Sequence, residues 1–136
     1  MQKDLLDLEL QNDAPRTSGE TLLGIDYGTK YSGLAFSPDS IVTLPLEVVP
    51  TERLFERTQQ LVDQKNCSKI IIGLPLSSDG SENENCAAIR SFSSLLQTLA
   101  PVELVNERYS SQQTLGPKNK RCDDLAAARI LEYYLS

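Results

Sequence analysis

The segment of the sequence that most restricts the fold is residues 69–74, which read Lys-Ile-Ile-Ile-Gly-Leu. This continuous apolar run is typical of a parallel strand that is buried on both faces of a sheet. It is far shorter than the ~20 apolar residues that a membrane span needs. Segments with the pattern of amphipathic helices stand on either side of it in the sequence, at 51–64 and from 81 or 82 to 99. A buried parallel strand between two helices predicts an α/β protein.

Four further segments have the length and composition of β-strands. They are residues 21–26, 31–37, 41–49 and 102–105. The first two flank a short turn and are expected to pair as an antiparallel hairpin. Pro45 interrupts the third segment, which suits the edge of a sheet because proline cannot donate a hydrogen bond to a neighbouring strand.

A last helix is expected from residue 122 or 123 to residue 135, so the elements follow one another in the order βββαβαβα. In the first helix Thr51 is expected to be the N-cap, and in the second helix Leu95 is expected to face inward. The order of elements predicts a five-stranded mixed sheet flanked by helices, which is the order of the ribonuclease-H-like fold. In open sheets of this kind, chemistry collects at the carboxyl ends of the strands.

The chain has 136 residues, which suits one domain. Residues 1–20 are acidic on balance, and a stretch with Pro, Ser and Gly ends them. We expect them to form a flexible acidic arm, as either a frayed terminus or a helix that binds a partner. Residues 21–136 are expected to form the folded domain.

The composition excludes several kinds of site. The chain has no His, which excludes Ser-His-Asp triads, Cys-His dyads and metal sites with His ligands. Its 3 Cys form no C-x-x-C pair, and this odd number, with no export signal at the start, predicts a cytosolic protein. The net charge of −6 disfavours non-specific binding of nucleic acid. It leaves open an enzyme whose carboxylates are covered by divalent cations.

Three acidic residues occupy positions where a carboxylate would emerge from the core. Asp26 and Glu107 each follow a short strand pattern, and Asp123 lies at the start of the last helix. Asp123 shares a helix stripe with Ala127, so it is expected to face the sheet, whereas Asp124 is rotated by about 100° and points elsewhere. The three acids together predict a cluster of carboxylates at one edge of the sheet. The alternative is that they are ordinary charges at strand and helix ends.

Such a cluster predicts a metal site, because a buried carboxylate without a partner is costly and the sequence offers no His nearby. Three carboxylates with open water positions suit Mg²⁺ or Mn²⁺. Two such ions ~4 Å apart activate water and stabilise the leaving oxygen in phosphodiester hydrolysis. The residues therefore predict a metal-dependent nuclease that acts on structured nucleic acid.

Four segments, taken in order, are similar to a known family. They are LGIDYGTKYSGLA at 23–35, IGLPLSSDGS at 72–81, NERYSS at 106–111 and DDLAAARILEYYL at 123–135. On these motifs the chain resembles the YqgF (RuvX) family of Holliday-junction-resolvase-like nucleases, also described as pre-16S rRNA maturation nucleases. The resemblance implies that Asp26, Glu107 and Asp123 are the catalytic, metal-binding acids, which are the same three that the residue pattern predicts.

The resemblance further implies processing of the 5′ end of pre-16S rRNA in ribosome biogenesis, in the cytoplasm and in contact with the small ribosomal subunit. The sequence departs from the family pattern at two positions. The family often has Arg where Tyr31 stands and Asp where Asn106 stands. The first change weakens a contact to phosphate, and the second withholds a charge from the site.

Several residues are candidates for contact with the substrate, because exposed backbone amides and basic side chains bind phosphate. They are Gly28, Thr29 and Lys30 in the turn after the first strand, Pro75 and Gly80 in the loop before the second helix, Arg108, and Lys118, Lys120 and Arg121 in a basic segment. Each has a structural alternative, namely a tight hairpin in which Gly28 needs a positive φ, a capped loop, or a solvated or ion-paired base.

Three other functions remain open on the sequence. A Holliday-junction resolvase on branched DNA would need a dimer to cut two strands symmetrically, and we expect a monomer or a weak homodimer. A non-catalytic RNA- or ribosome-binding module on the same fold is the second. The turn at 26–29 also resembles the phosphate loop of ATPases related to actin and sugar kinases, but those enzymes need two such domains, which 136 residues cannot supply.

Overall fold

The computed structural model describes residues 19–77, 79–106 and 120–136, and the side chains of all of these except 120–123. Five strands form one sheet in the order β3-β2-β1-β4-β5. They are β1 (Leu22–Asp26), β2 (Tyr31–Ser37), β3 (Leu44–Pro50), β4 (Lys69–Leu74) and β5 (Val102–Asn106). β2 pairs antiparallel with β1 and β3, while β4 pairs parallel with β1 and β5. The expected five-stranded mixed sheet is confirmed, with the Pro45-containing strand at its edge.

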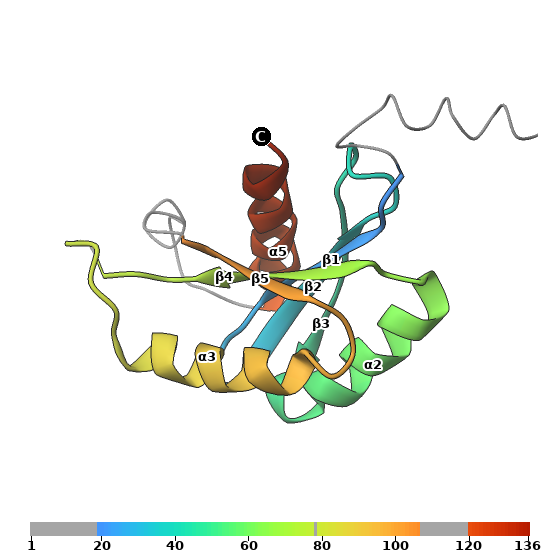
Figure 1. Ribbon diagram of the computed structural model, residues 1–136. Helices are drawn as coiled ribbons and strands as arrows, with labels where there is room; N and C mark the ends of the chain where they lie inside the picture. Colours follow the sequence, from blue (N-terminus) through green and yellow to red (C-terminus); the bar gives the residue numbers. More distant parts are fainter. Residues whose placement is uncertain (1–18, 78, 107–119) are drawn as a thin grey trace, which may run out of the picture.

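Helices cover both faces of this sheet, as Figure 1 shows. They are α2 (Leu54–Lys65), which follows the 3-10 turn η1 (Thr51–Arg53), α3 (Glu84–Leu96) and α5 (Lys120–Leu135). The core consequently has two parts. Ile25 and Ile72 pack with α2 and α3 on one face, while Leu22 and Ile71 pack with α5 on the other. β4 is buried on both faces, as its apolar run predicts.

β3 begins later than its sequence pattern predicts. Ile41 and Val42 were expected to be strand residues, but their N–H groups donate to Oδ1 of Asp39 at 2.9 and 3.0 Å. Ser40, which lies between Asp39 and Ile41, has a φ of 65°. The Asp39 side chain thus forms a turn that uses the backbone donors a strand would need, and pairing starts only at Leu44.

Several expectations about the helices were wrong in detail. Thr51 is not an N-cap, because it opens η1 with no side-chain cap bond and α2 begins at Leu54. Leu95 is 54% exposed, since the buried stripe of α3 runs through residues 86, 89, 93 and 96 and leaves Leu95 to one side. α3 begins at Glu84, later than the expected 81 or 82, and ends at Leu96, before residue 99. α5 begins at Lys120, before the expected 122 or 123.

The expected acidic arm lies outside the described part of the chain, except for residues 19 and 20. Its boundary with the folded domain therefore stays a prediction. None of the helices in the described ranges is long and apolar enough to cross a membrane.

Candidate active site

Asp26 is the last residue of β1 and stands at the carboxyl end of that strand. Side chains alternate along a strand, and Leu22 packs with α5, so Asp26 faces the same side of the sheet as α5. On β2 its partner is Gly33, and on β4 Gly73 lies level with it by the register of the two strands. The half-buried carboxylate is therefore flanked by bare backbone on both neighbouring strands.

α5 lies very close to β1 where the two elements cross. A Cβ atom added to Gly24 would lie 2.6 Å from Cγ of Leu131 and 3.1 Å from the carbonyl oxygen of Ala127. A residue with a side chain at this position would push the helix away from the strand. Gly24 thus sets the depth at which α5 packs on the sheet.

The direction of α5 brings its first turn to the end of the sheet where Asp26 stands. Near the C-terminus of the helix, the Tyr134 hydroxyl accepts a 3.0 Å hydrogen bond from Nζ of Lys69, at the start of β4. The C-terminal end of α5 therefore lies by the start of β4, its middle lies over Gly24, and its first turn is directed towards the carboxyl ends of β1 and β4. The backbone of Asp123, one turn before Ala127, lies towards the Asp26 end.

The other expected site residues are only partly described. Three of them lie outside the described ranges, namely Glu107, Arg108 and Lys118. Three more are described by their backbone alone, in the first turn of α5, namely Lys120, Arg121 and Asp123. β5 ends at Asn106, which pairs with Leu74 at the end of β4. The chain therefore leaves β5 at the same edge of the sheet as Asp26, directly before Glu107.

The donor chemistry at this edge fits a hard divalent cation. Asp26 offers carboxylate oxygens, which Mg²⁺ and Mn²⁺ prefer, beside two glycines that add no side chain. Among the side chains that the structure describes, no group of three His, Cys, Asp or Glu residues could hold a metal ion. The expected cage takes two of its three acids from outside that set, so its geometry stays a prediction.

A closed ring of hydrogen bonds fixes the turn that follows Asp26. The Gly28 N–H donates to Oγ of Ser32 at 3.1 Å, the Ser32 and Thr51 hydroxyl oxygens lie 2.7 Å apart, and the Thr51 hydroxyl donates to the Gly28 carbonyl at 2.7 Å. Because a carbonyl can only accept, the single hydroxyl proton of Thr51 is committed to Gly28, and Ser32 must donate to Thr51. Each of the three groups thus donates once and accepts once.

Ser32 and Thr51 are the residues of this edge that sequence reasoning missed. Thr51 also donates its N–H to the Lys30 carbonyl at 2.9 Å, so it holds the turn at two points. The residues lie 19 positions apart, and a Thr before a helix reads as a cap. Nothing in the local pattern distinguishes a capping hydroxyl from one that bonds to a neighbouring turn.

The turn requires glycine at position 28 because it has no room for a side chain there, and not because of the φ angle. The glycines with positive φ among the described residues are Gly19 and Gly80, so the expected positive φ at Gly28 was wrong. A Cβ atom at Gly28 would instead lie 2.2 Å from the Tyr31 carbonyl oxygen. Thr29 and Lys30 in the same turn are exposed. The turn is therefore a tightly closed connection that presents Lys30 to solvent beside Asp26.

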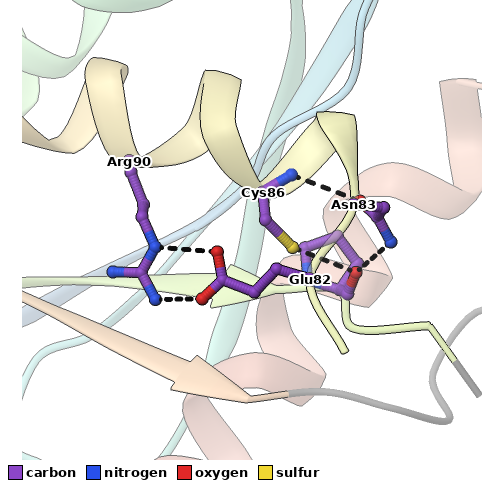
Figure 2. A network of polar contacts seen from close by, with 5 residues as sticks. Glu82, Asn83, Cys86 and Arg90 are labelled. Carbon is purple, nitrogen blue, oxygen red and sulfur yellow. Dashed lines mark hydrogen bonds and ion pairs between the residues drawn. The ribbon is translucent and has the colours of Figure 1, made fainter. Parts of the chain in front are cut away.

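The loop after β4 is anchored by one asparagine, shown in Figure 2. The Asn83 amide nitrogen donates to the Pro75 carbonyl at 3.2 Å and to Oγ of Ser77 at 3.1 Å. Its oxygen accepts from the N–H groups of Asn85 and Cys86, which caps α3. The Cys86 thiol also donates to the Pro75 carbonyl, at 3.5 Å. Asn83 thus joins the end of β4 to the start of α3.

Several backbone N–H groups of this loop donate hydrogen bonds to acceptors within the same loop. Gly80, with a φ of 89°, donates its N–H to the Ser77 carbonyl, and Ser77 donates to the Ser81 carbonyl, both at 2.8 Å. The Ser81 N–H donates to Asp79 at 2.9 Å. These bonds give Pro75 and Gly80 a structural role, while their contact with phosphate stays a prediction.

An exposed ion pair borders the same loop. Arg90 on α3 donates two hydrogen bonds to the Glu82 carboxylate, as Figure 2 shows. The bonds from Arg90 lower the pKa of the Glu82 carboxyl group. Because both side chains are about half exposed, we expect the pair to add little stability.

The fold and the position of Asp26 define the class of protein as a ribonuclease-H-like α/β domain. Among solved structures, the chain is similar to RuvC of Thermus thermophilus in complex with a Holliday junction substrate. The TM-score is 0.57 and the identity 13%, and the match covers 85% of this chain and 93% of that one. At this identity the likeness shows the fold alone.

The sequence comparison then shows the family. Residues 20–136 match the sequence pattern of RuvX, described as a Holliday junction resolvase, and the chain belongs to this family. A relative from Sulfurihydrogenibium sp. is 36% identical over 128 residues, covering 84% of this chain and 88% of the relative. One from Bordetella petrii is 38% identical over 125 residues, covering 85% and 95%. Both are named as candidate pre-16S rRNA nucleases. The resemblance stated from the four motifs is thereby confirmed.

Proposed function

We propose that this protein is a nuclease that hydrolyses phosphodiester bonds in structured nucleic acid, and that it processes the 5′ end of pre-16S rRNA. Membership of the RuvX family supports nuclease activity, and the names of the two relatives support the RNA substrate. The observation that carries the proposal is the Asp26 carboxylate at the carboxyl end of β1, on the α5 face, between Gly33 and Gly73. Neither of these two neighbouring positions places a side chain beside the carboxylate.

We further propose that Asp26, Glu107 and Asp123 together hold Mg²⁺ or Mn²⁺. When bound, such ions polarise the phosphate and lower the pKa of water. Asp26 stands on a strand that is paired on both sides, so the sheet fixes the backbone from which its carboxylate extends. In the sequence Glu107 directly follows β5, whose last residue pairs with the end of β4, and the first turn of α5 carries the backbone of Asp123 towards the Asp26 end of the sheet.

The substrate contacts are proposed from the elements that border this edge. Lys30 is exposed in the turn after Asp26, beside the backbone of Gly28 and Thr29. The other proposed contacts are Arg108, Lys118, Lys120 and Arg121 as phosphate-binding cations, and Pro75 and Gly80 in the loop after β4. In a chain of net charge −6, these few bases would position the phosphates and would not drive non-specific binding.

The first test is cleavage of labelled pre-16S rRNA 5′-leader RNA and of a four-way DNA junction, each in Mg²⁺, Mn²⁺ and EDTA. Asp26→Asn removes the charge with almost no change in size. Asp63→Asn makes the same chemical change on the exposed side of α2, across the sheet from Asp26, and serves as the matched control. Loss of cleavage in EDTA and in Asp26→Asn, with Asp63→Asn active, is the expected result.

Two results would contradict the proposal. Residual cleavage by Asp26→Asn would mean that the site is misplaced or that a contaminant cuts the RNA. Binding of both substrates without cleavage in any metal would favour a non-catalytic RNA- or ribosome-binding module on the same fold.

A Holliday-junction resolvase is the second candidate function, because the family carries that description and the fold resembles RuvC. It would cut the four-way junction in preference to the leader RNA, and only as a dimer, because two strands must be cut symmetrically. Sedimentation of the protein with and without the junction therefore accompanies the cleavage assay. With the rRNA substrate we also propose a cytoplasmic location and contact with the small ribosomal subunit.

A further inference from the structure

An aromatic ring stands beside the proposed active site with no role in it so far. Tyr31 is the first residue of β2, and 41% of its surface is exposed. It precedes Gly33, the partner of Asp26, by two positions. Because side chains alternate along a strand, Tyr31 and Asp26 share the α5 face of the sheet.

The distance between Tyr31 and Asp26 is short enough for both residues to contact the same nucleotide or two adjacent nucleotides. Two residues along a strand span about 7 Å, and paired strands lie about 5 Å apart, so the Cα atoms of Tyr31 and Asp26 are about 8 Å apart. A nucleotide whose phosphate lies at the proposed active site can therefore place its own base, or the base of the next nucleotide, on the Tyr31 ring.

The backbone that carries Tyr31 is held firmly. Tyr31 pairs with Pro50 on β3, and the carbonyl of Lys30, directly before it, accepts the Thr51 N–H at 2.9 Å. On the other side, the Tyr31 carbonyl abuts Gly28 so closely that a Cβ atom there would lie 2.2 Å away. A ring fixed at its base loses little conformational freedom when a ligand stacks on it, which favours binding.

The negative net charge of the chain favours a contact with nucleic acid that does not depend on charge. With a net charge of −6, the protein gains little from general attraction to phosphates. Stacking of a base on an aromatic ring needs no charge and accepts every base, but it requires a base that is not paired within a duplex.

We propose that Tyr31 is a stacking platform for an unpaired base next to the bond that is cut. This inference rests on the proposed nuclease site at Asp26. It restricts the substrate class to nucleic acid that is single-stranded on at least one side of the cut, and it disfavours continuous duplex.

The test compares two RNA substrates of one sequence, with the nucleotides around the cut left open in one and paired to a complementary strand in the other. Tyr31→Leu removes the ring, Tyr31→Phe keeps it, and Tyr133→Leu removes a tyrosine that is 64% exposed near the far end of α5. We expect Tyr31→Leu to lower the ratio of kcat/KM for open over paired RNA by about 5- to 100-fold, chiefly through KM. Tyr31→Phe is expected to restore most of the ratio, and Tyr133→Leu to resemble wild type. An unchanged ratio in Tyr31→Leu would overturn the proposal.

A binding measurement separates failure of this proposal from failure of the proposed function. Open RNA with 2-aminopurine at successive positions is titrated with Asp26→Asn protein, alone or combined with Tyr31→Leu. Stacking on Tyr31 predicts that the 2-aminopurine fluorescence is quenched at one position. This quenching should be lost in Asp26→Asn/Tyr31→Leu and retained in Asp26→Asn/Tyr133→Leu. Such quenching without cleavage by wild type would keep Tyr31 as a base-binding residue and refute the nuclease. Equal quenching with and without Tyr31→Leu would refute the stacking platform, whether or not the RNA is cut.

Discussion

Replacing Thr51 by Val tests the hydrogen-bond ring that fixes the turn after Asp26. Valine keeps the branched shape of threonine but lacks the hydroxyl. The change leaves the Gly28 carbonyl without the Thr51 donor and leaves the Ser32 proton without its acceptor. The Thr51 N–H bond to the Lys30 carbonyl is retained, since it involves the backbone alone.

The magnitude follows from the two groups that lose a partner. An unsatisfied polar group that is largely shielded from water costs about 1–3 kcal/mol, and Ser32 is fully buried. Water can reach the partly exposed Thr51 side of the ring, which places the expected loss of unfolding free energy at about 2 kcal/mol. For a domain of this size, each kcal/mol lowers Tm by roughly 3–6 °C. Thr51→Ser retains the hydroxyl and is expected to lose less than about half of that amount.

Urea denaturation of wild type, Thr51→Val, Thr51→Ser and Ser32→Ala measures these differences. The double variant Ser32→Ala/Thr51→Val completes a double-mutant cycle. Both substitutions remove the same hydrogen bond between the Ser32 and Thr51 hydroxyls, so a closed ring predicts a coupling energy of about 0.5–3 kcal/mol between them. Equal stability of Thr51→Val and wild type, or strict additivity of the two changes, would refute the reasoning.

Further predictions follow from packing, charge and the cysteine. Gly24→Ala is expected to lower the free energy of unfolding by about 1–3 kcal/mol, because its Cβ atom would lie 2.6 Å from Cγ of Leu131; an unchanged urea midpoint would mean that α5 shifts away without cost. Arg57→Ala breaks bonds of 2.6 and 3.0 Å to Glu47, a pair whose side chains are 31% and 32% exposed, and is expected to cost about 1 kcal/mol or less, so a several-fold larger loss in the same assay would contradict this expectation. Burial raises the pKa of the Cys67 thiol from 9.0 to about 11, so at pH 8 iodoacetamide is expected to alkylate it far more slowly in the folded protein than after unfolding. The thiol ionises at lower pH in the unfolded chain, so folding stability falls as pH rises from 9.0 to about 11, a decline that Cys67→Ala is expected to reduce.

Local sequence patterns predicted the elements that are most deeply buried. β2 and β4 have the bounds that their patterns indicated, because burial on both faces leaves one continuous run of apolar or small residues. The same reasoning placed Asp26 at a strand end, since a charge that follows such a run marks the point where the strand leaves the core. Expectations were less accurate at element ends, where single side chains such as Asp39 and Asn83 decide which backbone groups are bonded.

The sequence by itself determined the type of fold, the family and the position of Asp26 at a strand end, because these depend on periodicity and on motifs within short stretches of chain. Only the tertiary structure decided that Gly33 and Gly73 flank that carboxylate and that Gly24 admits α5. It likewise decided that Thr51 closes a ring with Gly28 rather than capping a helix. The physical reason is distance along the chain. A hydroxyl makes the same local pattern whether it bonds to the next turn or to a carbonyl 23 residues away, and the sheet register decides which carbonyl it meets.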